Sequence, residues 1–585
     1  MRLRRFSCIL KSNTLPSNYS QKEELGMHKD CVVSIPSVRG KISKQTTKSG
    51  IYIHYILDRT YDPKTKLTKP NRVLIGKQVP NTDTMVPNGN FLKYFPNTVF
   101  PEIRETAERS STLLIGSFVV MRQIVKDYGL DAMLKKYFGD KTGLVLDFAA
   151  YMIVEERNQG QYFPEYAYRH PLFSKGMKIV SDTTVSDFFS NVDSDQINGF
   201  LSDWNANRDH KGRIYISYDS TNKNNQAGNI DFIEFGKAKV DQGCPIFNLG
   251  IAYDQTNQVP LFYENYPGSI NDVSQFKFLV DKAIAFNYRK IGFIVDRGYF
   301  SKDNIAYMDE HAFEFVMMVK GCKPFVSELI NELRNTFENR ANGLLRKHYL
   351  SGTTVKKKLF PEDTKERYIH VFFSPMKMAT ERRALDDLIL DMEKVFEKSI
   401  GREVEFSAPY TDYFNCHYDH KRKFLFAEEK PDAIEKACSM CGYFCIVTSE
   451  KMSAAEAYML YSGRDASEKL FAADKSFLGS NSMRVHTKES LSAKIFIEFI
   501  ALIIRQRLFN LLKEQMLKLP TKQNYMTVPA AIRELEKIEI IRINNGNYRL
   551  DHAITKTQEI ILNSFGITKD RVIRKAAVIS TLLAK

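Results

Sequence analysis

Cysteine is scarce in this chain of 585 residues, which holds eight cysteines and a single tryptophan. Eight cysteines are too few for the disulfide scaffold of a secreted protein, so a reducing compartment is expected. No stretch reaches the ~20 apolar residues that a membrane-spanning helix needs. An apolar run near the start, residues 6–10, is too short for a signal peptide and ends at Lys11. These absences predict a soluble, intracellular protein with no membrane partner.

Acidic residues are also relatively few. The chain has 69 Asp and Glu but 84 Lys and Arg, which gives a net charge of +15. Residues 1–50 alone hold ten basic and three acidic side chains. A basic excess of this size suits a polyanionic partner. The hydrophobic content of 43% is that of an ordinary globular protein. The length allows two to four domains.

Changes of pattern along the chain divide it into six predicted regions. In chain order they are 1–110, 111–210, 211–325, 326–449, 450–515 and 516–585. The first is basic and contains a small β-meander, and the second is helical and a candidate for DNA binding. The third and fifth are the two parts of one α/β core, separated by an inserted domain. The last is a small α+β tail.

One helix of the second region has two interpretations. Residues 181–189 place N-cap residues before an apolar run, which predicts the start of a short helix. Such a helix fits a helix-turn-helix that grips DNA. A plain packing helix is the commoner meaning, and we prefer it.

The third region reads as three strands of antiparallel type, then helix, strand, helix and strand. Asp219 ends the first strand-like run, and Asp296 ends the fourth. This order is that of a ribonuclease-H-like α/β core. The first and fourth strands of such a sheet lie side by side, so we expect Asp219 and Asp296 to be close together.

A predicted helix over residues 453–477 completes this group of side chains. It begins at a capping box formed by Ser453 and Glu456. At 100° per residue, four polar side chains fall within an arc of about 60° on one face. These are Tyr461, Arg464, Glu468 and Lys475.

Two interpretations of that face differ in whether they predict partner residues elsewhere in the sequence. A solvated face with an ordinary Arg464–Glu468 pair predicts no particular partner. A carboxylate metal ligand flanked by phosphate-binding cations requires two more acidic residues at strand ends, and Asp219 and Asp296 meet that requirement. Mg²⁺ takes oxygen ligands, with few protein carboxylates plus waters and phosphate. Two such ions ~4 Å apart can assist an in-line displacement at phosphorus.

The motifs that carry these residues resemble those of DDE transposases from bacterial insertion sequences. These motifs are Asp219-Ser-Thr, Asp296-Arg-Gly-Tyr and Tyr461-x2-Arg464-x3-Glu468-x6-Lys475. The last is similar to the YREK signature of the insertion-sequence-4-like superfamily. The resemblance covers about residues 211–510.

The resemblance implies a role for each of the six residues. It implies catalytic metal ligation by Asp219, Asp296 and Glu468, which hold two Mg²⁺ ions with Mn²⁺ as a substitute. It implies that Tyr461, Arg464 and Lys475 bind the DNA backbone near the cut.

A function follows from the same resemblance. It implies a transposase that cuts double-stranded DNA at the terminal inverted repeats of its own element and joins these ends to target DNA. We expect a homodimer on DNA, in the bacterial cytoplasm and associated with the nucleoid. A nuclease of the same fold that does not join ends is one alternative. A domesticated DNA-binding protein that no longer cuts is the other.

The long interval between Asp296 and Glu468 is the reason for predicting an inserted domain. Arg382 and Arg383 within it are candidate DNA contacts, although solvated surface is their default interpretation. Cysteines 438 and 441 have the spacing of zinc ligands. Cys445, however, lies in a run typical of a buried strand, where free cysteine behaves as a small hydrophobe, so zinc is the less favoured interpretation.

Overall fold

The computed structural model describes most of the chain after residue 31. The described ranges are 32–47, 50–63, 65–80, 82–98, 109–208, 213–226, 230–236, 243–270, 272–320, 323–339, 343–543 and 546–583. The basic residues 1–31 of the first predicted region lie outside them. The chain divides into one unit of Met1–Leu113, Glu539–Ala553 and Ile573–Lys585 and a second of Leu114–Ile538 and Ile554–Val572.

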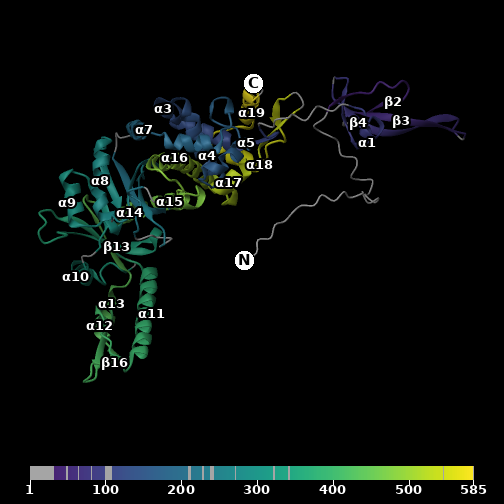
Figure 1. Cartoon of the computed structure of the whole chain (residues 1–585). Helices are drawn as coiled ribbons and strands as arrows, with labels where there is room; N and C mark the ends of the chain where they lie inside the picture. The colour runs from purple at the N-terminus through teal and green to yellow at the C-terminus, as the bar shows by residue number, and fades with distance from the viewer. Residues whose placement is uncertain are drawn as a thin grey trace, which may run out of the picture. The chain divides into compact units, whose positions relative to one another are not determined.

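A five-stranded antiparallel sheet with the order β1-β5-β4-β3-β2 builds the first unit (Figure 1). Its elements are β1 (Val33–Ser34), β2 (Ile42–Thr47), β3 (Gly50–Asp62), β4 (Leu67–Gln78), β5 (Thr84–Pro87) and α1 (Gly89–Tyr94). Strands β3 and β4 lie in the region for which the sequence predicts a small β-meander. One face of the sheet packs with α1 through Ile53, Ile75, Met85 and Phe91. The opposite face mixes His54 and Lys77 with the apolar Ile56 and Leu74.

A nine-stranded sheet organises the second unit, in the order β12-β13-β14-β17-β11-β10-β7-β8-β9. The strands are β7 (Ile214–Asn224), β8 (Ile246–Asp254), β9 (Val259–Pro267), β10 (Ile291–Val295), β11 (Glu314–Met318), β12 (Leu344–Leu345), β13 (Leu350–Lys357), β14 (Arg367–Phe373) and β17 (Tyr443–Thr448). Strands β7, β8 and β9 are antiparallel neighbours. Strand β10 runs parallel to β7 on its other side and β11 parallel to β10. The predicted adjacency of the first and fourth strands is therefore confirmed.

Helices precede the sheet in sequence and pack around one long helix that follows it. They are α2 (Gly116–Tyr128), α3 (Leu130–Phe138), α4 (Thr142–Glu155), α5 (Phe163–Arg169), α6 (Asp182–Ser190), α7 (Ser194–Ala206) and the long α16 (Lys488–Lys518). Phe496 of α16 stacks on Phe138, and Phe499 contacts Tyr263 of β9. Helix α16 therefore lies between the helical layer and the sheet.

Helix α6 is the segment for which the sequence allowed a helix-turn-helix. It begins as expected, because the Ser181 side chain accepts a hydrogen bond from the Thr184 N–H. Its buried side chains are Val185, Phe188 and Phe189, and the last packs edge-on against Phe148 of α4. The apolar face of α6 is thus used for packing within the helical layer.

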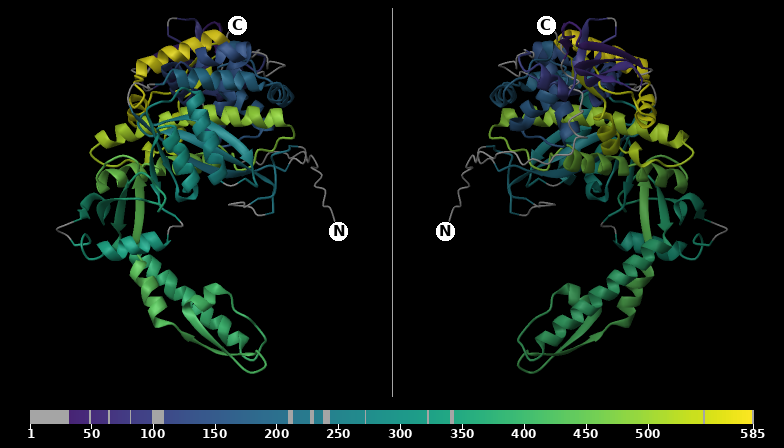
Figure 2. Two further views of the ribbon diagram at one scale, coloured as in Figure 1. Left: turned by 90° about the vertical axis from the view of Figure 1, so that its left-hand side faces the viewer. Right: turned by 90° about the vertical axis from the view of Figure 1, so that its right-hand side faces the viewer.

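The stretch for which the sequence predicts an inserted domain contributes both to the sheet and to a projecting element. Strands β13, β14 and β17 extend the sheet beyond β11. Between β14 and β17 the chain forms α11 (Pro375–Ser399), α12 (Ala408–Tyr413), β15 (Phe414–Tyr418), β16 (Phe424–Glu429) and α13 (Pro431–Met440). Figure 2 shows these elements projecting from the sheet. Their own core joins Ile389 and Phe396 of α11 to Phe414 and Phe424 of the hairpin. Cys445 is buried in β17, as predicted.

Further helices are α8 (Asp272–Ala285), α9 (Lys302–Glu310), α10 (Lys323–Leu333), α17 (Val528–Leu535), α18 (Lys556–Asn563) and α19 (Lys569–Leu583). Strands β18 (Glu539–Arg542) and β19 (Tyr548–Leu550) form an antiparallel hairpin. Among the described residues, no helix combines the length and the apolar character that crossing a bilayer requires.

Candidate active site

Two carboxylates lie on neighbouring parallel strands of the large sheet. The register pairs Tyr218 of β7 with Val295, the last residue of β10. Asp219 and Asp296 each follow one member of that pair, so they lie side by side. The sequence predicted that the first strand ends at Asp219, and this is wrong. Strand β7 continues to Asn224 because its polar residues pair with β8, from Ser220 opposite Gly250 onward.

The helix that carries the other candidate residues is divided in two, where the sequence predicted one. Helix α14 (Ala454–Ser462) begins at the predicted capping box, which is confirmed. Helix α15 (Asp465–Phe477) begins after a tight turn at Gly463 and Arg464. Two short-range hydrogen bonds mark the turn, from Arg464 N–H to the Tyr461 carbonyl at 3.1 Å and from Ala466 N–H to the Gly463 carbonyl at 3.0 Å. Such 3₁₀ bonds tighten the backbone locally.

The side chain of Gln255 approaches this turn closely at Gly463. A Cβ on Gly463 would lie 2.3 Å from Oε1 of Gln255. Tyr461 therefore belongs to α14, Arg464 to the turn, and Glu468 and Lys475 to α15.

The Arg464 guanidinium contacts three carboxylates. Its Nη1 lies 3.7 Å from Asp219 Oδ2, and its Nη2 lies 4.0 Å from Asp296 Oδ1. The same Nη2 lies 2.7 Å from Glu468 Oε1. Burial lowers the pKa of Arg464, but the surrounding negative groups, Asp296 foremost, outweigh it and raise that pKa overall. The guanidinium thus stays charged at the centre of the site.

Tyr461 supports one of these carboxylates from α14. Its hydroxyl donates a hydrogen bond to Asp296 Oδ1 at 3.1 Å. Burial, helped by the charge of Asp296, raises the pKa of this phenol well above its usual value. Tyr461 therefore remains protonated and acts as a donor that orients Asp296. The Arg464 guanidinium also lies 5.6 Å from the centre of its ring.

The structure thus joins five of the six predicted residues through direct side-chain contacts. Lys475 lies two turns beyond Glu468 on α15, about 10 Å along the helix axis. The side chains of Asp219, Asp296 and Glu468 are 18%, 35% and 52% exposed, so the carboxylates are open to solvent.

The donor chemistry of the site fits a hard divalent cation, because all three candidate ligands are carboxylates. As placed, no group of three His, Cys, Asp or Glu side chains in the described ranges is arranged to hold a metal ion. Asp219 and Asp296 come from adjacent strands, whereas Glu468 is connected to them through Arg464. A cation bound by all three would therefore need Glu468 to swing inward, which its exposure permits.

A buried ion cluster beside the site was not predicted from the sequence. Lys223 of β7 places its Nζ 2.6 Å from Asp474 Oδ2 of α15 and also contacts Glu498 of α16. All three side chains are fully or almost fully buried. Burial lowers the pKa of Lys223 and raises that of Asp474. The only sequence signal is a lysine within a polar run that turns out to be an interior strand.

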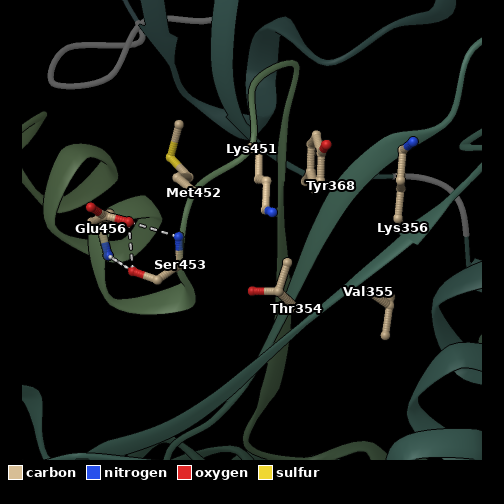
Figure 3. Close-up of a pocket in the computed structure, with 8 residues that line it drawn as sticks. All are labelled: Thr354, Val355, Lys356, Tyr368, Lys451, Met452, Ser453 and Glu456. Carbon is tan, nitrogen blue, oxygen red and sulfur yellow. Dashed lines mark hydrogen bonds between the residues drawn. The ribbon is translucent and has the colours of Figure 1, made fainter.

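A separate hollow of about 580 Å³ opens at the start of α14 (Figure 3). Its lining residues are Thr354, Val355, Lys356, Tyr368, Lys451, Met452, Ser453 and Glu456. The Glu456 carboxylate in this hollow already forms the capping box. Its Oε2 accepts hydrogen bonds from the N–H and the hydroxyl of Ser453 at 2.8 and 2.7 Å. None of the six predicted site residues lines this hollow, so we assign it no part in the chemistry.

Comparisons with known proteins bear on the same stretch of chain. Residues 217–504 match the family model of a transposase DDE domain, a range that contains the carboxylates contacted by Arg464. Among solved structures, a piggyBac transposase synaptic complex with hairpin DNA is similar over 77% of this chain and 84% of its own, with 9% identity and a TM-score of 0.32. No curated protein matches the chain.

Proposed function

This chain carries a transposase DDE domain over residues 217–504 and is a DDE transposase, and from that premise we propose that it moves an insertion sequence. In this proposal it cuts double-stranded DNA at the terminal inverted repeats of its element and joins the ends to target DNA. The YREK-type assignment to the insertion-sequence-4-like superfamily is part of the proposal. So is a cytoplasmic, nucleoid-associated location in a bacterium.

One observation carries the proposal, namely the contact of a single guanidinium with Asp219, Asp296 and Glu468. Enzymes of this class depend on divalent metal, and we propose two Mg²⁺ ions held by these carboxylates, with Mn²⁺ as a substitute. Bound there, such ions neutralise charge on the phosphate and lower the pKa of an attacking water or hydroxyl.

The protein residues have distinct roles in the proposed reaction. Tyr461 holds Asp296 in place by its hydrogen bond. Arg464 and Lys475 bind backbone phosphates, a task for which guanidinium and ammonium groups are suited. Arg464 is the better placed for the scissile phosphate, because it already lies among the carboxylates.

Two displacements at phosphorus account for cutting and joining. In the first, a water oxygen bonds to the phosphorus, the bond to the 3′ oxygen breaks, and that oxygen leaves as a 3′-hydroxyl. In the second, the freed hydroxyl bonds to a target phosphorus, and the target's own 3′ oxygen leaves with the proton. The number of phosphodiester bonds is unchanged by the second step, so joining needs no separate energy source.

We propose a homodimer on DNA. Joining two ends requires both in one complex, and a single site holds one reacting phosphate. Two-fold symmetry is the commonest closed arrangement. The mass of the active protein–DNA complex tests this, and one chain per complex would contradict it.

The test of the function uses a plasmid that carries the DNA flanking the gene on both sides. We expect Asp219→Asn, Asp296→Asn and Glu468→Gln each to abolish Mg²⁺-dependent cleavage and joining, while circular dichroism and DNA binding stay normal. Glu514→Gln, which removes an exposed carboxylate of α16, is the control and should keep activity. Near-normal cleavage by any of the three variants would remove that residue from the site.

The products of the unmodified protein separate the alternatives. Joined products support transposition, and cleaved but unjoined DNA would indicate a nuclease. Binding without any cleavage would indicate a domesticated DNA-binding protein.

A further inference from the structure

The hairpin of β3 and β4 extends well beyond the sheet to which it belongs (Figure 1). Strand β2 pairs with β3 only from Gly50 to Tyr55, and β5 pairs with β4 only from Gly76 to Gln78. From Asp58 opposite Asn71 to Asp62 opposite Leu67, the two strands pair only with each other. This two-stranded segment, which we call the ribbon, is about 15 Å long at the rise of a β-strand.

The two faces of the ribbon differ in charge. Directly opposed residues of an antiparallel pair share a face, and successive residues alternate between faces. One face carries Asp58, Thr60, Asp62, Leu67, Lys69 and Asn71. There Lys69 Nζ lies 3.3 Å from Asp62 Oδ2, so its charge is partly neutralised.

The opposite face of the ribbon carries arginine and no acid. Its residues are Arg59, Tyr61, Thr68 and Pro70. Arg72 continues this face just beyond the ribbon, where it pairs with the buried Ile56. The two guanidinium groups contact neutral acceptors, the Gly40 carbonyl at 3.2 Å and Gln45 Oε1 at 3.3 Å. Both arginines are exposed. We call this the arginine face.

The arginine face continues onto the sheet, on the side away from α1. Tyr52 alternates with the core residue Ile53 and pairs with Lys77. The Lys77 ammonium lies 5.5 Å from the centre of the Tyr52 ring. Arg72 pairs with Ile56, which lies two residues from His54 and therefore on the same face. Burial, and then the charge of Arg72, lower the pKa of His54. A cationic and aromatic surface thus runs from the sheet to the end of the ribbon.

The composition of the region favours a polyanion over an apolar partner. Residues 33–95 hold eleven Lys and Arg but three Asp and Glu. A strongly basic surface attracts nucleic acid. A two-stranded β-ribbon is one of the two elements that the major groove of B-DNA admits, the groove being about 12 Å wide. Arginine is also the commonest side chain to read guanine there.

The end of the ribbon adds apolar contact area. Tyr61, on the arginine face, is 58% exposed, although it is a large hydrophobic side chain. Thymine methyl groups on the floor of the major groove offer such side chains an apolar surface.

We propose that the arginine face of β3 and β4 enters the major groove of double-stranded DNA and anchors the protein outside the catalytic domain. The proposal rests on the proposed function for its DNA partner. It assigns sequence reading to Arg59 and Arg72, and phosphate contacts to Lys77.

The test measures binding of the full chain to a duplex carrying one end of the element and to a random duplex of equal length. We expect the double variant Arg59→Gln, Arg72→Gln to bind the end duplex about tenfold more weakly. It should also lose preference for that duplex over the random one. The matched control is Lys69→Gln, on the other face of the same ribbon, which should bind nearly as the unmodified protein does. Circular dichroism checks that the variants are folded.

Two competitors identify the groove. Methylation of guanine N7, which lies in the major groove, should weaken binding by the unmodified protein and leave the double variant unaffected. Duplex RNA should compete poorly, because its major groove is deep and narrow. Unchanged affinity and preference in the double variant, or equal competition by duplex RNA, would overturn the proposal.

Failure here can be told apart from failure of the proposed function. At protein concentrations that saturate the DNA, the double variant should still cut in a Mg²⁺-dependent way. If the unmodified protein itself cuts nothing, the proposed function fails, whatever the ribbon binds.

Discussion

Lys223 Nζ lies 2.6 Å from Asp474 Oδ2, with both side chains fully shielded from solvent. Lys223 follows Asp219 by four residues on β7, and Asp474 follows Glu468 by six on α15. The ion pair therefore connects the strand that carries one candidate ligand to the helix that carries another. Glu498 adds α16 to the connection. Burying ions costs several kcal/mol each, so we interpret the cluster as a device that fixes α15 against β7.

Replacing Lys223 should show how much the buried ion cluster contributes to the stability of the fold. Lys223→Met leaves two buried carboxylates facing each other, and we expect a loss of about 3–5 kcal/mol in the free energy of unfolding. Urea unfolding measures this. The comparison is the triple variant Lys223→Met, Asp474→Leu, Glu498→Leu, which should regain stability because hydrophobic replacement of a whole buried ion cluster is often neutral.

The triple variant also tests the positioning role. We expect it to fold and to bind DNA, yet to cut with a lower rate at saturating DNA. Full recovery of both stability and cutting rate would reduce the cluster to a packing role.

The sequence was sufficient for part of the site and not for the rest. The order of the strands, with one aspartate after each apolar run, predicted that Asp219 lies beside Asp296, and the register of β7 and β10 agrees with it. The capping box located the start of α14, since its two residues are local in sequence. Local signals failed at Gly463 and Arg464, where both residues keep right-handed helical φ and ψ values, so nothing in residue type forces a break.

Contacts between distant segments were the other limit. Lys223, Asp474 and Glu498 come from three elements, and their meeting cannot be read from spacing. The pairing of β14 with β17 and of β17 with β11 is similarly non-local, and strand propensity depends on such context. A stretch read as a separate insertion therefore contributes strands to the main sheet.

Lys494 of α16 should make stability depend on pH. Burial lowers the pKa of this lysine from 10.5 to about 7, and its ammonium donates to the Met483 carbonyl. Above pH 7 the folded state binds less than one proton here, whereas the unfolded state binds one until about pH 10.5. Stability should therefore rise as the pH rises between these values, by at most ~1.4 kcal/mol per unit.

Urea unfolding at several pH values measures the slope of the unfolding free energy against pH. This slope should be smaller in Lys494→Met than in the unmodified protein. The difference between the two proteins gives the contribution of Lys494 separately from that of Lys223, whose pKa is also lowered by burial. Identical slopes would show that Lys494 is not the titrating group.

The contacts of Arg464 lead to a prediction about metal that does not depend on activity. Its guanidinium lies within 4.0 Å of Asp219, Asp296 and Glu468 and offsets their mutual repulsion. In Arg464→Gln the three carboxylates lose this compensation, so we expect a lower melting temperature in the presence of a chelator. A loss of 1 kcal/mol lowers the melting temperature of a domain of 150–250 residues by about 2–4 °C, and of a larger domain by less.

Mg²⁺ should restore what the guanidinium supplied. Because a ligand that binds only the folded state stabilises it, adding MgCl₂ should raise the melting temperature of Arg464→Gln more than that of the unmodified protein. Arg382→Gln, which removes an exposed arginine of α11, is the control and should respond to Mg²⁺ as the unmodified protein does. Arg464→Gln should also bind DNA with a weaker dependence on salt. The slope of log affinity against log salt concentration should fall by ~0.9, which is the signature of one lost phosphate contact. An equal response to Mg²⁺ in all three proteins would mean that Arg464 does not share its carboxylates with a metal ion.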